Sequence, residues 1–573
     1  MRKVILSCVF MLYSVVSFSQ GTYINLGSDA YRFLDRLDIK YGKIIPLEHT
    51  GDKPYHRGQV AKVAETLILS NLRFNKVQQY QIQYLLDDNA EWLDSLQSKT
   101  RRPLFKVLYQ EPASFAHVSS KKKGLWDIRF NPALDLRMGI ESDDRRFIFQ
   151  RVLGLEVRGN IKRVFSFYFN VHGNSARLPG YVTDKAFRGS DSDYVYIPGQ
   201  SYYKTYSSKI FKFNDGVDYF DARGYINLHI LKHINLTFGR DKNFIGNGQR
   251  SMLLSDFSAP YLFLKFNVNI WRFNYTSIFA ELNSQYFRGG DKLLPKKYMA
   301  VHHLSIQATH YLNIGLFEGV IFKRSNHFEL QYLNPIIFYR AVEHAIGSPD
   351  NVLIGADFKA NMLKHLSLYG QFVLDEFNFS HVTKRDGWWA NKWALQIGLK
   401  CIDIVPNLDA QLEFNVARPF TYTHSGEINF THYNQPLAHP LGANFYEFIM
   451  NLHYQPVPKL SLNAKFFVAV VGDDTLDING NMTNYGGDIL QGSGGTSVTQ
   501  VYNNKIAQGA RGTISYFQFL ATYRPWHNIF IDAELMYRGK TTKTGINNPL
   551  TNQSTFLFTI GARMNIPYRS NEF

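Results

Sequence analysis

The sequence predicts an antiparallel β-barrel of the outer-membrane type, all-β and transmembrane, with about 18 strands and a small helical region before them. Three observations support this fold class. From about residue 124 onward, short segments alternate between apolar and polar residues. Very short turns between these segments alternate with long polar loops. The chain also ends on such a segment, with only a few residues after it.

The composition fits this fold class. The chain has 573 residues, a formal net charge of +16 and 15% aromatic residues, with 35 Tyr and 45 Phe against 7 Trp. Tyr and Phe favour strands and interfaces with one apolar and one wet side. No apolar run of about 18 residues follows the N-terminus, which argues against membrane-spanning helices. The basic balance favours phosphate-bearing lipids or acidic glycans as partners of an exported protein, and argues against nucleic acid.

Residues 1–19 have the features of a secretory signal peptide. Two basic residues come first, residues 4–16 are mostly apolar, and the small residues Ser17 and Ser19 precede a cut before Gln20. The alternative interpretation is a short buried helix. An exported chain with this architecture is expected in the outer membrane of a Gram-negative bacterium.

Cysteine usage is sparse. The chain has two cysteines, Cys8 and Cys401, and cleavage of the signal peptide would remove the first. No intrachain disulfide is then available, so the stability of the exported protein must come from a large hydrogen-bonded fold.

Residues 20–120 predict a small helical region, interpreted as periplasmic. The first helix is expected to begin at the cap formed by Ser28 and Asp29. Three sets of apolar residues recur at helical spacing, namely Tyr31, Leu34, Leu37 and Tyr41, then Val60, Val63, Ala64, Leu67 and Ile68, then Val77, Tyr80, Tyr84 and Leu85. A packing and plugging element is the plainer interpretation, and a docking site for another periplasmic protein is the alternative.

Residues 121–573 predict the barrel with its long extracellular loops. Alternation of apolar and polar residues, over the length that a tilted membrane strand needs, is clearest in six segments. These segments are 153–158, 354–361, 366–375, 409–416, 460–468 and 529–538.

The connections between strands are short and long in turn. The short ones lie at 159–163, 232–235, 311–313, 362–365, 454–459 and 523–528. The long ones lie near 174–217, 241–258, 283–298, 323–351, 378–390, 418–443, 471–510 and 540–552. Outer-membrane barrels have this pattern, whereas a sandwich has no reason to keep it. With both termini periplasmic, the one short connection that falls outside is 142–146.

Aromatic residues at the turn ends predict a girdle at the membrane interface, formed by Tyr454, Tyr523, Trp526 and Tyr568. On the opposite face of the strands, charged residues of both signs would point into the lumen. They are Glu156, Arg158, Asp357, Lys359, Asp375, Asp409, Glu413, Lys465, Asp532, Glu534, Arg538 and Arg563. Mixed signs predict a salt-bridged lumen rather than a selective pore. A barrel of this size leaves an aqueous channel unless it is plugged, and the long loops could plug it.

No catalytic constellation or cofactor site is predicted. His302 and His303 are adjacent in a strand and must point to opposite faces, so they cannot chelate one ion. His424, His432 and His439 share a loop without recognised ligand spacing, and the polar stretch 472–481 departs from a calcium loop. The glycine-rich stretch 244–250 lacks the helix of a phosphate-binding loop and predicts a loop over the barrel mouth.

The stretches "GRDKNFIGNGQRSMLLSDFSAPY", "FELQYLNPIIFYRAVEHAIGSPDNVLIGADFK" and "DAYRFLDRLDIKYG" resemble a Bacteroidota outer-membrane family. That family comprises RemB-type gliding-motility proteins and, more distantly, Wzi-like capsule-assembly proteins. The resemblance implies a barrel of roughly 18 strands with periplasmic helices that binds or organises surface polysaccharide. It implies no catalytic residue. The positions that match the family motifs are Arg240, Asp241, Gly246, Gly248, Asn334, Pro335, Arg340, Glu343, Asp350 and Asn351. Arg340 and Glu343 could pair across one helical turn and hold a folded-in loop.

The last strand is expected to close the barrel. Its residues Thr559, Gly561, Met564 and Ile566 resemble the signal that the barrel-assembly machinery reads. The alternation predicts that every second residue faces lipid, namely Phe556, Phe558, Ile560, Ala562, Met564 and Ile566, while Arg563 faces the lumen. This strand must then pair with the first one, near 125–140, because an open edge cannot lie in lipid.

The function hypothesis is a non-enzymatic outer-membrane surface protein that supports gliding motility or binds and organises exopolysaccharide. A porin-like solute channel is the alternative, and an outer-membrane lipase or protease is a third class without a nucleophile–base pair to support it. The expected partners are outer-membrane lipid and lipopolysaccharide, surface polysaccharide, gliding or secretion machinery, and the barrel-assembly machinery during biogenesis.

Overall fold

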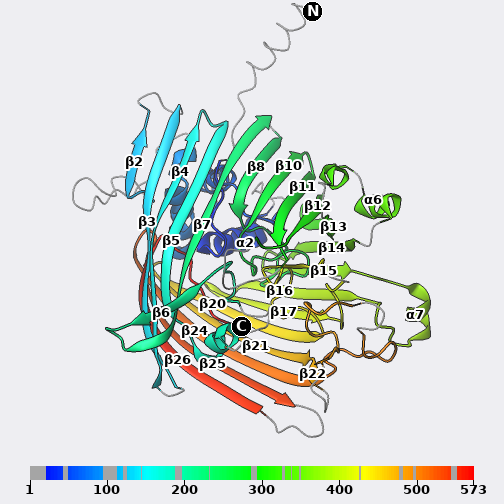
Figure 1. Ribbon diagram of the computed structural model, residues 1–573. Helices are drawn as coiled ribbons and strands as arrows, with labels where there is room; N and C mark the ends of the chain where they lie inside the picture. The colour runs from blue at the N-terminus through cyan, green and yellow to red at the C-terminus, as the bar shows by residue number, and fades with distance from the viewer. Residues whose placement is uncertain are drawn as a thin grey trace, which may run out of the picture.

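The computed structural model describes most of the chain as one closed barrel (Figure 1). The described residues are 21–42, 49–93, 113–120, 125–142, 145–187, 196–231, 233–284, 293–324, 329–336, 338–347, 350–424, 427–476, 482–493, 498–543 and 551–573. The expected signal peptide and the stretch 477–481 of the calcium-like loop lie outside them.

Eighteen antiparallel strands form the wall, as the alternation predicted. In chain order they are β3 (Trp126–Glu141), β4 (Phe147–Ile161), β5 (Phe165–Arg177), β7 (Phe213–Leu231), β8 (Ile234–Asp241), β10 (Tyr261–Ile270), β11 (Phe273–Asn283), β12 (Lys296–Thr309), β13 (Leu312–Phe322), β14 (Asn351–Met362), β15 (Leu366–Leu374), β16 (Trp393–Val405), β17 (Leu408–Ala417), β20 (Phe445–Val457), β21 (Leu460–Asp473), β24 (Ala510–Trp526), β25 (Ile529–Lys543) and β26 (Thr551–Met564).

Shorter strands extend the wall or lie inside it. At the rims, β2 (Ala116–Ser119) pairs with β3 and β6 (Lys204–Ser208) pairs with β7. Three two-stranded ribbons complete the set, formed by β1 (Asp52–Lys53) with β9 (Phe244–Ile245), β18 (Thr431–His432) with β19 (Gln435–Pro436), and β22 (Thr475–Leu476) with β23 (Met482–Thr483). The short connections stand where they were predicted, and two more join β10 to β11 and β16 to β17.

The barrel closes between its last and first strands, as predicted. β26 pairs antiparallel with β3, and the register places Arg563 opposite Asp135 and Leu557 opposite Glu141. Arg563 points into the lumen, where it donates a hydrogen bond to Asp532 over 2.6 Å. The closure leaves no strand edge of the wall open to lipid at this seam.

The wall is apolar outside and polar inside, the reverse of a soluble sheet. On β4, the outward Leu153 is 55% exposed, whereas the inward Glu156 and Arg158 are each 3% exposed. Tyr454, Tyr523 and Trp526 are exposed near the short turns, and Trp271 joins them there. A wall of this kind is stable only if lipid covers its outer face. Within the described ranges, no helix combines the length and apolar character needed to cross a membrane.

The helical region contains the three predicted helices, α2 (Asp29–Tyr41), α3 (Arg57–Leu69) and α4 (Lys76–Asp88), followed by the 3₁₀ turn η1 (Ala90–Trp92). Ser28 caps α2 by accepting a hydrogen bond from the Ala30 amide, and Asn75 forms a capping box with Gln78 on α4. The helices share an apolar core of their own, which includes Phe33, Leu37, Val60, Leu67, Ile82 and Leu85.

This helical bundle lies inside the barrel, at the end where the short turns are (Figure 1). Lys359 on β14 donates to Asp35 over 2.9 Å and to Asp38 over 2.8 Å. Arg524 on β24 pairs with Asp29. Asn75 contacts the β16–β17 turn through Asn407 over 3.0 Å. These contacts hold the bundle within the wall rather than beneath it.

Acid is expected to weaken the attachment of this bundle. Burial alone raises the pKa of Asp29, but the charges of Arg524 and Arg32 outweigh it and lower the pKa to about 2. The unfolded value is about 3.9. A depressed pKa stabilises the docked state above the unfolded value, and this contribution is lost as pH falls through the folded value. Pepsin cleavage of the helical region should therefore increase between pH 4 and pH 2, while the barrel stays heat-modifiable.

The matched control for this acid effect is Asp29→Asn, which removes the titrating group. At pH 4 pepsin should cleave this variant faster than the native protein, and the cleavage rate of the variant should change less between pH 4 and pH 2. Identical pH profiles for the two proteins would contradict the assignment of the acid effect to Asp29.

Candidate functional site in the barrel lumen

The loop between β8 and β10, residues 242–260, descends into the lumen. Its strand β9 pairs with β1 of the N-terminal region, and the Gly246 amide donates to the Gly51 carbonyl over 2.8 Å. Gly246 has φ +143°, and a Cβ on Gly248 would stand 2.5 Å from the Glu413 carboxylate. These two glycines allow the backbone to approach the wall closely. The prediction that 244–250 turns over the barrel mouth is therefore wrong, because the backbone pairs with partners deep in the lumen.

Arg250 is the centre of a buried ion cluster at the tip of this loop. Its backbone amide and that of Gln249 donate to Glu413 over 3.1 and 2.7 Å. The guanidinium pairs with Glu447 at 3.2 Å and with Glu572 at 2.8 Å. Burial alone would lower the pKa of Arg250, but these carboxylates raise it. The cluster joins the loop, the wall and the C-terminal end of the chain.

The C-terminal tail turns back into the lumen after β26. In Figure 1 the C-terminus lies near the centre of the barrel. Glu572 accepts a hydrogen bond from Lys465 over 2.6 Å, and the Phe573 ring stacks on Phe467 at 5.5 Å. The sequence prediction placed the C-terminus on the periplasmic side, and the structure adds that the last residues fold into the lumen. The ion pairs of Glu572 are the physical reason.

Two predictions for this tail are corrected by the same turn. Tyr568 was predicted to join the aromatic girdle, but its ring lies in the lumen, 4.3 Å from the Arg137 guanidinium carbon. Ile566 was predicted to continue the lipid-facing set, but the strand ends at Met564 and Ile566 is buried with Ala133 and Val152.

The described parts of the loop between β17 and β20, residues 418–444, also enter the lumen. The Ser255 amide donates to the Leu437 carbonyl over 2.7 Å, which joins this loop to the loop 242–260. His439 contacts Glu447 at 2.8 Å, whereas His432 lies within 3.1 Å of the Asn283 amide. These two histidines thus serve separate contacts. Across the described residues, no group of three His, Cys, Asp or Glu side chains has the geometry of a metal site.

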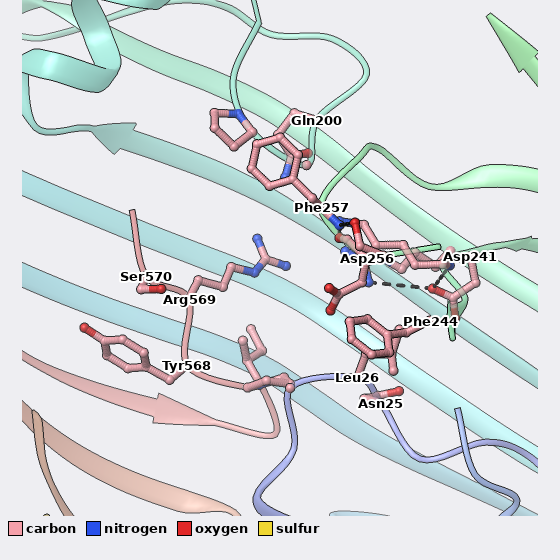
Figure 2. Close-up of a pocket in the computed structure, with 18 of the residues that line it drawn as sticks. Asn25, Leu26, Gln200, Asp241, Phe244, Asp256, Phe257, Tyr568, Arg569 and Ser570 are labelled. Carbon is pink, nitrogen blue, oxygen red and sulfur yellow. Dashed lines mark hydrogen bonds and ion pairs between the residues drawn. The ribbon is translucent and has the colours of Figure 1, made fainter. Parts of the chain in front are cut away.

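A cavity of about 340 Å³ remains between these elements and the wall strands β4, β5 and β7. Its walls combine aromatic rings, amides and charged groups, as Figure 2 shows. Arg569 extends from the tail toward the cavity, and its guanidinium lies 2.9 Å from His172. On the other side, Lys242 donates to the Asp256 carbonyl over 2.9 Å, and burial lowers the pKa of this lysine to about 8. Aromatic and amide residues of the lining include Tyr168, Asn170, Gln200, Tyr219, Phe244, Gln249, Phe257 and Tyr568.

A smaller cavity of about 70 Å³ lies toward the helical bundle. The two cavities share the lining residues Ile24, Asn25 and Gly27 and the segment 566–568. Pro567 packs against Gly27, where an added Cβ would be 3.3 Å from the Pro567 Cβ. The first and last described segments of the chain thus separate the two spaces.

The twelve charged residues predicted for the lumen all point into it or border its contents. Ten are buried, and Asp375 and Asp409 are half-buried. Many of their partners belong to the lumen filling: Asp409 pairs with Arg36, and Lys465 pairs with Glu572. Other contacts join Glu156 to Arg158, Asp357 to His303, Lys359 to Asp38, Asp375 to the Tyr422 amide, Glu413 to the Gln249 amide, Asp532 to Arg563, Glu534 to Thr559, and Arg538 to the Tyr181 ring. The sequence indicated the charges but not these partners.

The family-motif positions fall into two separate places. The lumen and its wall contain Asp241, Gly246, Gly248 and Asn351. The side-chain amide of Asn351 donates to the Ile428 carbonyl over 3.0 Å. Arg240 faces outward on β8 and donates to the Ala222 carbonyl over 2.6 Å.

The remaining motif positions belong to the connection between β13 and β14. Asn334, Pro335, Arg340 and Glu343 lie in it, and Asp350, at its end, accepts hydrogen bonds from Arg324 over 2.8 Å. Arg340 and Glu343 form the predicted pair at 2.6 Å, on α6 (Tyr339–Ile346), but this helix packs on the outer face of the wall and not in the lumen.

The fold resembles known outer-membrane barrels. Wzi of Escherichia coli, described as an outer membrane protein involved in group 1 capsule assembly and a carbohydrate-binding β-barrel, matches at 11% identity and a TM-score of 0.54, over 96% of this chain and 99% of Wzi. Weaker matches include OccAB2 of Acinetobacter baumannii (8% identity, TM-score 0.41, 76% and 97% coverage) and the outer membrane protein OprD of Pseudomonas aeruginosa (10%, 0.39, 77% and 94%).

No protein-family model and no curated protein sequence matches the chain. The structural match to Wzi confirms the fold that the resemblance to Wzi-like proteins implied, which is that of an outer-membrane β-barrel.

Proposed function

We propose that this protein is a non-enzymatic outer-membrane barrel that binds and organises an exported polysaccharide. The observation that carries the proposal is the filled lumen. The helical bundle, the loops 242–260 and 418–444 and the C-terminal tail occupy it together, and they are held by buried ion pairs. A filled barrel is a scaffold for surface loops rather than a solute path.

The chemistry of the cavity and the loops supports a sugar ligand. Sugars bind against aromatic faces with amide and charged hydrogen-bond partners, and the cavity of about 340 Å³ offers both. The size suits a short glycan segment. The Wzi of Escherichia coli, whose fold this chain shares, is described as carbohydrate-binding. The formal net charge of +16 favours an acidic glycan.

A second aromatic surface lies on the loops opposite the short turns. His381 stacks on Trp388 at 4.4 Å and lies 6.0 Å from Tyr502, which is 47% exposed. The Trp389 amide donates to the Val501 carbonyl over 3.0 Å and ties the two loops together. This aromatic surface is the place where a long polymer would first contact the protein.

The test is the binding of the purified protein to acidic and neutral exopolysaccharides. We expect the acidic polymers to bind more tightly and binding to weaken as salt rises. Tyr502→Ala should reduce affinity about fivefold, because one stacked aromatic contributes about 1 kcal/mol. Tyr311→Ala is the matched control, since Tyr311 is 57% exposed beside a short turn at the other end of the barrel. No binding across both classes of polymer would contradict the proposal.

The biological setting is either capsule assembly or gliding motility, in line with the sequence resemblance to RemB-type and Wzi-like proteins. The two settings separate in a deletion strain. Loss of surface spreading with an intact capsule places the protein in motility, and loss of cell-associated polysaccharide places it in capsule assembly. The same filled lumen argues against the alternative function as a porin-like channel.

A further inference from the structure

The described parts of the connection between β13 and β14 lie on the outside of the barrel. On β13, Phe317 and Ile321 belong to the core inside the lumen, so the alternate residues Glu318 and Val320 face outward. The outward Leu316 is 53% exposed, as expected for a lipid-facing side chain. Glu318 and Val320 also face outward, yet they are 8% and 0% exposed. The 3₁₀ turn η3 (Leu330–Leu333) and α6 cover them, because Val320 clusters with side chains of both.

Glu318 is the reason for this cover. A carboxylate that faces lipid is costly unless it is paired or shielded. The two oxygens of Glu318 accept hydrogen bonds from the Tyr339 and Arg340 amides over 2.9 and 3.0 Å, in the first turn of α6. The helix N-terminus favours a negative charge there. The neighbouring outward His302 contacts the Tyr339 hydroxyl, so α6 shields a second polar group as well.

The register shows that α6 lies at the level of the apolar belt. Glu318 is directly opposite Ile354 on β14, and Ile354 is an outward side chain that is 49% exposed. Glu318 is also opposite His302 on β12. The helix therefore begins beside residues that face lipid, not above them.

The outer side of this connection carries large apolar side chains. Leu330 is 69% exposed, Ile336 is 88% exposed and Phe338 is 77% exposed. They lie on the same segment as Tyr332 and Tyr339, whose rings pack on outward side chains of the wall. The one exposed cation of the helix, Arg340, pairs with Glu343 and leaves the apolar contacts as the dominant feature.

We propose that the described parts of the segment 329–347 form an interfacial anchor in the outer leaflet, with Leu330, Ile336 and Phe338 among the acyl chains of the lipid. Short amphipathic segments lie in this way at the boundary between headgroups and acyl chains. The anchor would fix the depth and tilt of the barrel on this side. It is independent of the ligand of the lumen.

The test places a fluorophore on the anchor in a protein without native cysteines (Cys8→Ser and Cys401→Ser). An environment-sensitive dye is attached at Ile336→Cys or Phe338→Cys, and the protein is reconstituted into phosphatidylcholine vesicles that contain doxyl-labelled lipid. Ile210→Cys is the matched control, because Ile210 is 85% exposed in the turn of the β6–β7 hairpin. We expect lipid quenching at 336 and 338 to exceed that at 210 at least twofold, and quenching by aqueous iodide to show the opposite order.

Two results would overturn the anchor. Iodide quenching at 336 and 338 as strong as at 210 would place the segment in water. Protection of both labels from lipid and from iodide would mean that a second copy of the chain covers the segment, and cross-linking of the vesicle sample would then reveal a dimer.

Discussion

Replacing Arg250 with methionine is expected to release the loop 242–260 and the C-terminal tail from the lumen. The substitution leaves Glu447 and Glu572 buried without their shared cation. Removing one partner of a buried ion pair costs about 3–5 kcal/mol, because the remaining charge is uncompensated. Since the wall strands keep their own hydrogen bonds, the cost should fall on the lumen filling. Limited proteolysis should then cleave within 242–260 and near the C-terminus, at sites that are protected in the native protein.

The matched control is Arg73→Met, which removes an exposed arginine from the helical region. Its cleavage pattern should equal that of the native protein. A second variant, Arg250→Met with Glu447→Gln, removes the carboxylate that loses its arginine partner, whereas Glu572 still pairs with Lys465, and should restore part of the protection. Native-like protection in Arg250→Met alone would show that the ion cluster does not hold the loop.

Placing an arginine on the lipid-facing side of the closing strand is expected to prevent normal insertion. Ile560, in the interior of β26, is 54% exposed on the outer face. A lipid-facing Arg costs roughly 2–4 kcal/mol near the bilayer midplane and about 0–1 kcal/mol near the interface. Ile560→Arg should therefore greatly reduce the heat-modifiable barrel in the outer-membrane fraction.

Met564→Arg is the matched control for depth, because Met564 is the last residue of the strand and should tolerate the charge better. Ile397→Arg on β16 separates the cost in lipid from any damage to the closing signal, since Ile397 is 48% exposed and lies far from the seam. A reduced amount of heat-modifiable barrel in both Ile560→Arg and Ile397→Arg supports the lipid-facing assignment. Native levels of both would contradict it.

Much of the wall could be predicted because its signals are local. The alternation around Leu153 and Glu156 fixes which side faces lipid, and the turn at 159–163 fixes where the next strand starts. The helices could also be predicted, because the cap at Ser28 and the apolar residues from Tyr31 to Tyr41 lie close together in the sequence. The closing pair of strands followed from the rule that a barrel leaves no open edge in lipid.

The filling of the lumen could not be predicted in the same way, because its contacts join distant residues. Arg250 meets Glu447 and Glu572, and nothing local distinguishes this arginine from exposed ones. The tail after Met564 is too short to show any periodicity, so the inward turn of Ile566 and Tyr568 left no signal. The connection between β13 and β14 did leave a signal in the sequence. Glu318 interrupts the lipid-facing side of β13, and such a charge requires a cover.

The central claim is that this barrel is filled and acts as a scaffold for glycan binding. Single-channel recording of the native protein in planar bilayers tests it most directly. The structure predicts no steady conductance from the native protein. Large, steady openings from the native protein would contradict the claim and identify the protein as a channel.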